Sequence, residues 1–144
     1  MTSSRPETPA PAPRVLVIVG SNSDRAKIEP ALALLDDARV PYEFVVSSAH
    51  RDPDRTAQLA RDAAGRGIRV VIAGAGLSAA LPGAISALTS LPVIGVPFAS
   101  GPLNGLDALL AIAQLPSGAP VGTVGIDNAK NAALLALRIL ALTT

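Results

Sequence analysis

The chain has 144 residues, a length that suits one compact domain with a single core. Hydrophobic residues make up 49% of it and charged residues 16%, and its formal charge of +1 offers no footprint for nucleic acid or an anionic membrane. The sequence has no cysteine and one histidine, which excludes disulfides, thiolate catalysis and any metal site built on cysteines or clustered histidines.

Residues 1–13 are rich in Ser, Pro, Thr and Ala and lack the apolar core of a secretory signal. We expect a disordered leader here, a single domain over residues 14–144, and a cytoplasmic protein. No apolar run approaches the ~20 residues of a membrane-spanning helix. Because so few residues are charged, we also expect apolar surface to be covered by other copies of the chain.

Short β-branched runs predict buried strands at residues 14–19, 42–46, 70–73 and 93–96, with a weaker, glycine-containing fifth at 121–125. Apolar residues at helical spacing predict helices between them, around residues 28–35 and 57–64, and a last helix at 128–142. Pro30 lies inside the first helix, which must start late or bend there. Apolar strands that alternate with helices predict a parallel sheet covered on both faces, a three-layer doubly wound α/β fold.

Ligands of such sheets bind beyond the carboxyl ends of the strands, where the strand order reverses. Three segments therefore decide the function: residues 20–24 (GSNSD), 47–53 (SSAHRDP) and 74–78 (GAGLS). The first offers hydroxyls and backbone amides at a helix N-terminus, a setting that favours a phosphate, and Asp24 is suited to ribose hydroxyls. The alternative is that Ser23 or Asp24 only caps the helix.

The second segment contains His50, the one histidine. An imidazole side chain titrates at about 6.5 in model peptides, so a histidine can take and return a proton near neutral pH. Arg51 beside it offers a fork of donors for a phosphate or carboxylate. Asp52 and Pro53 are typical of a helix start. Taken alone His50 is an ordinary loop residue, but its place after a central strand favours a catalytic role.

The third segment brings backbone close to whatever lies over the sheet, although its small residues are equally suited to tight packing. Asp127 and Lys130, near the start of the last helix, are interpreted as solvated charges. The residues alone thus predict a pocket for a phosphorylated sugar with one titrating base and no metal, and they leave the reaction open.

Several motifs occur here in one order: GSNSD, SAHRDP, AGAG followed by ALPG, LPVIGVP, NGLD and QLPSGAPVGTVGIDNAKNAALLA. Together they closely resemble the class I PurE family of N5-carboxyaminoimidazole ribonucleotide mutases, over about residues 14–140. The resemblance implies a flavodoxin-like domain that assembles as a homo-octamer and moves CO2 from N5 to C4 of the imidazole of its ribonucleotide substrate. It implies no ATP, metal or organic cofactor, and no nucleic-acid or membrane partner.

The same resemblance implies a role for each site residue. His50 would be the general acid and base, and Ser21, Ser23, Asp24 and Arg51 would bind the phosphate and ribose. The imidazole and carboxylate end would be lined by Ser48, Gly74, Ala75 and Gly76. Residues 100–107 would close a site, either this chain's or a neighbour's. His50 followed by Arg51 favours the class I mutase, because the class II carboxylase usually carries a lysine after this histidine.

One position departs from the family pattern. The family usually reads GGAAHLPG where this chain reads GLSAALPG, so Ala80 replaces a second histidine and Ser78 is new. Two alternatives stay open: a PurE-like carboxylase, either class II or acting on another nucleotide as in the LarB family, and a nucleotide-binding module without activity.

Overall fold

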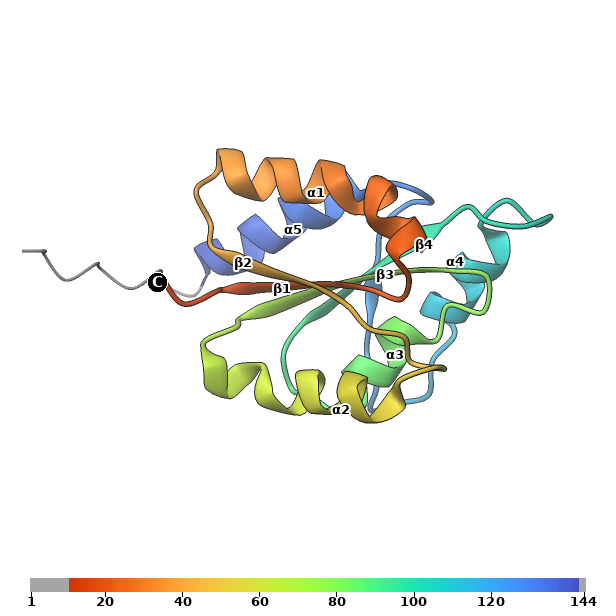
Figure 1. The fold of residues 1–144 in the computed structure, drawn as a ribbon, viewed down its shortest axis with the longest axis horizontal. Coiled ribbons are helices and arrows are strands. Elements are labelled where there is room, and N and C mark those ends of the chain that lie inside the picture. The colour runs from red at the N-terminus through yellow and green to blue at the C-terminus, as the bar shows by residue number, and fades with distance from the viewer. Residues whose placement is uncertain (1–10, 143–144) are drawn as a thin grey trace, which may run out of the picture.

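A computed structural model describes residues 11–142 and forms one parallel sheet with helices on both faces (Figure 1). The strands are β1 (Val15–Val19), β2 (Tyr42–Val46), β3 (Val70–Gly76), β4 (Val93–Phe98) and β5 (Gly122–Thr123). They lie in the order β2-β1-β3-β4-β5, and each neighbouring pair is parallel. This is the flavodoxin-like order, which confirms the predicted fold class.

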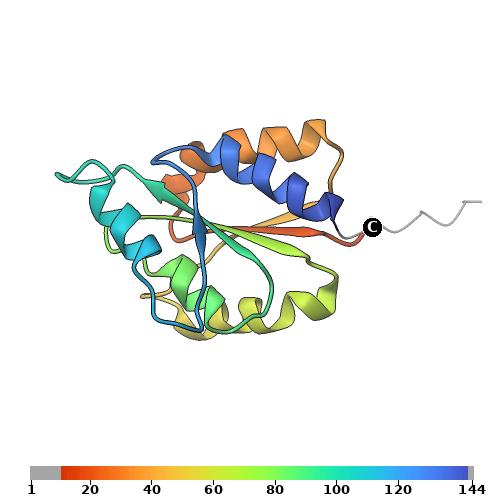
Figure 2. The same cartoon turned by 180° about the vertical axis from the view of Figure 1, so that it is seen from behind.

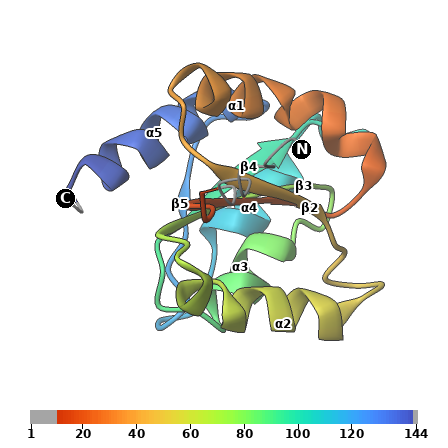
Figure 3. The ribbon, with the colours of Figure 1, turned by 60° about the vertical axis from the view of Figure 1, so that its left-hand side comes forward.

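The helices form the two outer layers, as Figure 3 shows with the sheet seen between them. They are α1 (Arg25–Asp37), α2 (Pro53–Asp62), α3 (Leu81–Ser86), α4 (Leu106–Ala113) and α5 (Ala129–Ala141), with short 3-10 turns η1 (Asn22–Asp24) and η2 (Ala64–Arg66). Helices α1 and α5 cover one face, and α2, α3 and α4 cover the other.

The core follows from the alternation of side chains along each strand. In β1, Val15, Val17 and Val19 pack under α1 and α5, whereas Leu16 and Ile18 pack under the other helices. All five of these side chains are completely buried, which is why the strand reads as an uninterrupted apolar run in the sequence.

Several boundaries differ from the predicted ones. The fifth strand shrinks to two exposed residues, Gly122 and Thr123, because a glycine there has no side chain to pack. Helix α1 continues through Pro30, the residue that was expected to delay or bend it. Pro30 and Ala26 are both exposed, so the Ala26 carbonyl that loses its helical donor faces solvent. Nearly all of the predicted leader lies outside the described residues.

The loops that follow β1, β2 and β3 meet at one end of the sheet, on the right in Figure 1 and on the left in the reverse view of Figure 2. Strand β1 lies between β2 and β3, so the chain reverses its direction of winding at this point. The predicted site segments are therefore brought together by topology, at the place where α/β sheets bind ligands.

Candidate active site

The loop after β1 is held by its own hydroxyl groups. The Ser21 hydroxyl accepts a hydrogen bond from the Ser23 amide at 3.3 Å and lies 2.9 Å from the Ser23 hydroxyl. The Asp24 amide donates to the Ser21 carbonyl at 3.0 Å. Ser21 is thus the residue that caps the first turn, and the Asp24 side chain makes no capping hydrogen bond. The Asp24 carboxylate remains available to a ligand.

The loop after β2 is built around Ser48. Its hydroxyl accepts from the Arg51 amide at 3.1 Å, and its carbonyl accepts from the Asp52 amide at 2.9 Å and the Thr56 hydroxyl at 3.1 Å. Beneath it, the buried Ser47 and Thr56 hydroxyl groups are 2.7 Å apart. Helix α2 begins at Pro53, as predicted. This scaffold fixes a tight loop and presents His50 and Arg51 at its exposed tip.

The loop after β3 contains a strained residue. Leu77 has a φ of 55°, a left-handed conformation that is unusual for a bulky side chain. The turn carries the chain from Gly76 past Ser78 to Ala80, whose amide donates to the Ser78 carbonyl at 2.7 Å. It leaves the Leu77 side chain 49% exposed, against the site.

These loops enclose a cavity of about 470 Å³. Eight of the nine predicted site residues line it: Ser21, Ser23, Asp24, Ser48, His50, Arg51, Ala75 and Gly76. Its remaining wall is made by Gly20, Ala49, Leu77, Ser78, Ala80, Leu81 and Ser100. Ser78 and Ala80, which depart from the family pattern, therefore both face the cavity.

Gly74 is the predicted residue that the cavity does not contain. A Cβ built on it would lie 2.7 Å from Cε2 of Phe98, on the side of the sheet that faces α1 and α5. Gly74 therefore makes room for the Phe98 ring beneath the site. Sequence reasoning did not separate it from Ala75 and Gly76, because the contact depends on the pairing of β3 with β4.

The charged groups of the cavity have different surroundings. Burial raises the pKa of Asp24 above the ordinary value of a carboxyl group, and the positive charge of Lys27 opposes this rise. Arg51 and His50 are exposed. One carboxylate, one guanidinium, one imidazole and several hydroxyls can together bind an anionic sugar and move one proton. Among residues 11–142, His, Asp and Glu form no cluster of three or more that could hold a metal ion.

A second, more apolar cavity of about 510 Å³ adjoins the first, and Leu77, Ser78 and Ala80 line both. Its other residues come mainly from α3, α4 and the segment after α4. One oxygen of Asp107 is buried beside it and has no hydrogen-bond partner in the part of the chain that the structure describes. A buried acceptor without a donor is costly, so this oxygen is suited to a hydrogen bond from a group outside the described residues.

Comparison with known proteins agrees with this geometry. The family model for AIR carboxylase (AIRC) matches residues 14–144. The N5-carboxyaminoimidazole ribonucleotide mutase of Pyrococcus horikoshii is 59% identical over 128 residues, 89% of this chain and 72% of that protein. The phosphoribosylaminoimidazole carboxylase of Schizosaccharomyces pombe is 53% identical over 133 residues, 92% of this chain but only 24% of that protein. The crystal structure of Treponema denticola PurE superposes with a TM-score of 0.82 at 29% identity, covering 92% of this chain and 82% of that one.

Fold and site together define a flavodoxin-like α/β domain whose cavity, at the switch point of the sheet, is lined by hydroxyl, carboxylate, imidazole and guanidinium groups. Within that class the chain belongs to the AIR carboxylase (PurE) family. The predicted family membership is confirmed.

Proposed function

We propose that this chain is an N5-carboxyaminoimidazole ribonucleotide mutase, an isomerase of purine biosynthesis. The observation that carries the proposal is the single cavity in which His50 and Arg51 stand opposite Asp24 and the two serines of the β1 loop. The names of curated relatives support it, since mutases that are 51–59% identical cover about nine tenths of this chain.

In the proposed reaction a protonated His50 donates its proton to N5 of the substrate. The bond between N5 and the carboxylate carbon breaks, its electron pair stays on nitrogen, and CO2 is released into the cavity. C4 then forms a bond to this CO2, and the neutral imidazole removes the proton from C4. One proton is given and one is taken, so His50 ends as it began.

The other residues bind and orient the substrate. Arg51 and the amides and hydroxyls of the β1 loop are suited to the phosphate, and Asp24 is suited to the ribose hydroxyls. Ala75 and Gly76 keep the backbone close to the imidazole ring, and Ser48 lies beside it. Small and apolar groups such as Ala80 and Leu81 would hold the freed CO2 near C4, a proximity effect. In this proposal His50 works without a second histidine, because position 80 is alanine.

The same cavity would suit a carboxylase that takes CO2 from solution, and the name of the Schizosaccharomyces pombe relative favours that second candidate. That protein is much longer than the matched region, so its name describes more than the part resembling this chain. The Arg51 that follows His50 favours the mutase.

We also propose that the chain works as a homo-octamer. Leu103, Leu106 and Leu110 are 49–58% exposed on and before α4, next to the unpaired oxygen of Asp107. An adjoining subunit would cover these leucines and supply a donor to Asp107. No helix within residues 11–142 is long and apolar enough to cross a membrane. We propose a cytoplasmic location, since a phosphorylated substrate does not cross a bilayer unaided.

One assay separates the candidates. The protein is incubated with N5-carboxyaminoimidazole ribonucleotide, and in parallel with aminoimidazole ribonucleotide plus bicarbonate. A mutase forms the C4-carboxylated product efficiently from the first substrate, and when labelled bicarbonate is added the product carries little label. Efficient turnover of the second mixture alone would favour the carboxylase. Binding of the ribonucleotide without turnover in either mixture would favour a module without activity.

A further inference from the structure

The peptide of Ala99, just beyond β4, is held from both sides. The Lys27 ammonium group in α1 donates a hydrogen bond to the Ala99 carbonyl. The Ala99 amide donates to the Asp127 carboxylate at 2.9 Å. Lys27 lies 72 residues before Ala99 and Asp127 lies 28 residues after it. Both hydrogen bonds therefore join parts of the chain that are distant in sequence. We call this arrangement the Ala99 clamp.

Asp127 is held in an unfavourable backbone conformation. Its φ is 57°, and its own amide donates to the Pro97 carbonyl at 2.8 Å. Its backbone and side chain therefore bind the end of β4 at two successive points. A left-handed conformation costs about 1–2 kcal/mol for a residue with a Cβ, although aspartate and asparagine tolerate it best. Here that conformation is what turns both groups of Asp127 toward β4.

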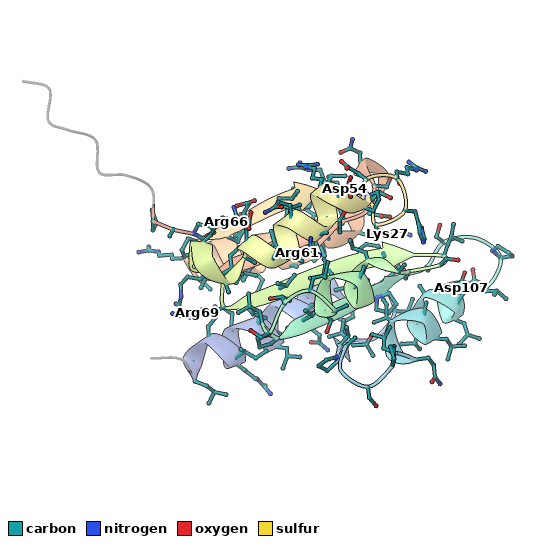
Figure 4. The ribbon with its side chains drawn as sticks, turned by 90° about the horizontal axis from the view of Figure 1, so that it is seen from below. Lys27, Asp54, Arg61, Arg66, Arg69 and Asp107 are labelled. Atoms are coloured by element: carbon teal, nitrogen blue, oxygen red, sulfur yellow. The ribbon has the colours of Figure 1, made fainter. Side chains whose placement is uncertain are left out.

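Lys27 lies close to residues at the end of β4 and to Asp24. Its ammonium group lies 5.8 Å from the centre of the Phe98 ring, and its charge acts on Asp24, which lines the cavity. Figure 4 shows Lys27 near the end of the sheet where Asp107 lies, far from Arg66 and Arg69 at the other end. It thus lies close to the active-site edge, where α1 meets the end of β4.

The residue directly after the clamp is Ser100, which lines the cavity. Beyond it the chain turns through Gly101, Asn104 and Gly105, all with positive φ, and residues 101–104 are exposed. The backbone hydrogen bond within this turn, from Asn104 to Gly101, is long at 3.4 Å. The Ala99 clamp therefore holds the peptide directly before Ser100 by contacts to two distant elements.

We propose that Lys27 and Asp127 are positioning residues, which hold the Ala99 peptide so that Ser100 closes over the bound ribonucleotide. The inference rests on the proposed function for its substrate. It concerns residues outside the SAHR and GSNSD segments. Asp127 is exposed, as a solvated charge would be, and the proposal adds a positioning role to it.

The first test compares matched variants by steady-state kinetics. Lys27→Met and Asp127→Gly each remove one hydrogen bond to Ala99, and KM should rise about tenfold with kcat largely kept. Asp127→Asn keeps an oxygen acceptor and tolerates the positive φ, so it should restore a KM near that of the unmodified protein. Lys130→Met is the control, because Lys130 is the other lysine of the chain and is exposed. A KM unchanged in both Lys27→Met and Asp127→Gly would overturn the proposal.

The second test asks whether the two residues act on one peptide. Once either contact is lost, losing the other should matter less, so the KM increase of the double variant should fall short of the product of the single increases. Two increases that simply multiply would show that the residues act separately.

A pH profile of kcat/KM separates the effect of the Lys27 charge on Asp24 from the loss of the hydrogen bond to Ala99. Asp24 shares its cavity with His50 and Arg51. Helix α1 carries two cations, Arg25 and Lys27, and Lys27 is the one whose charge lowers the pKa of Asp24. Removing Lys27 should raise the pKa of Asp24 further and move the acid limb of kcat/KM to higher pH. Asp127→Gly should leave that limb in place, and the same displacement in both variants would contradict this division of roles.

Amide hydrogen exchange tests the clamp without reference to activity. In the protein without substrate, the segment 98–105 should exchange about tenfold faster in Lys27→Met and Asp127→Gly, and at the normal rate in Lys130→Met. If the unmodified protein did not convert the ribonucleotide, the proposed function would be wrong, and the exchange measurement would still test the Ala99 clamp. Normal exchange in both variants of an active enzyme would refute the clamp alone.

Discussion

At the scale of single residues, the site separates proton transfer from binding. His50 and Arg51 are neighbours in one loop, but an imidazole can change its charge near neutral pH and a guanidinium cannot. Asp24, across the cavity, is the partly buried carboxyl among them. Each of these three residues gives a prediction of its own.

Replacing His50 by asparagine should abolish the proton transfers and leave the loop intact, because the Ser48 hydrogen bonds do not involve the His50 side chain. We expect kcat to fall by about 10²–10⁴-fold, the usual contribution of a general acid and base. Calorimetric titration should show that the variant binds the ribonucleotide with an affinity close to that of the unmodified protein. An unchanged kcat would rule out the proposed mechanism.

Replacing Arg51 by alanine should act on binding. Its interaction with a phosphate is made in the ground and transition states alike, so KM should rise by about one to two orders of magnitude with kcat nearly constant. Arg61→Ala is the matched control, since Arg61 is exposed at the far end of α2. A fall in kcat as large as the rise in KM would assign Arg51 to the chemistry instead.

The charged Asp24 side chain should lower the stability of the fold, although it contributes to substrate binding. Because burial raises its pKa in the folded state, the protein takes up a proton on folding, and stability falls as the pH rises through the interval between the unfolded and folded pKa values. At neutral pH Asp24→Asn should therefore raise Tm slightly and weaken substrate binding. The Tm difference should vanish at pH values below the ordinary pKa of a carboxyl group. Thermal unfolding at the two pH values is the measurement, and a lower Tm at neutral pH would contradict it.

At the scale of elements, buried strands were the most predictable feature. The runs that begin at Val15, Val70 and Val93 are apolar on both faces, and the structure has strands at all three. Helices α3 and α4 were not predicted, because they are only 6 and 8 residues long. So few residues show little periodicity, and α3 contains Pro82 and Gly83.

The site was predictable where it depends on strand order and missed where it depends on packing. The segments after β1, β2 and β3 converge because parallel strands end at one edge, which their sequence already indicated. The contacts of Gly74 and Asp127 were not predicted for another reason. One makes room for Phe98 and the other binds Ala99, and both partners lie more than 20 residues away in the chain. Asp127 has a positive φ, a conformation in which aspartate is enriched, but the sequence does not reveal this dihedral angle.

Alanine at position 74 should expose this packing constraint. Its methyl group would meet the Phe98 ring, so Gly74→Ala should lower the free energy of unfolding by about 1–3 kcal/mol. Gly65→Ala is the control, because a Cβ there meets nothing within 4 Å. Adding Phe98→Leu should recover part of the loss in a urea titration. Equal stability of the two alanine variants would show that β3 and β4 shift without cost.

At the scale of the whole molecule, several large apolar side chains are exposed around α4 and the loop after β3. Leu77 lines the apolar cavity, Leu103 lies just before α4, and Leu106 and Leu110 lie on α4. One buried oxygen of Asp107, also on α4, has no donor within the described residues. Leu77 and Ser78 also line the substrate cavity, so the expected subunit interface and the active site share these residues. We therefore expect the oligomer and the catalytic rate to be lost together.

Leu106→Asp is the sharpest test of this link. Leu106 is the first residue of α4 and is 51% exposed, and a carboxylate in the first turn of a helix is favourable, so the chain should still fold. Sedimentation velocity should show species smaller than those of the unmodified protein, and specific activity should fall with the fraction of dissociated chains. Lys130→Asp places a carboxylate at an exposed position in the first turn of α5, where it is equally favourable, and should leave both unchanged. A Leu106→Asp protein that stays fully assembled, or that dissociates and keeps full activity, would separate assembly from the active site.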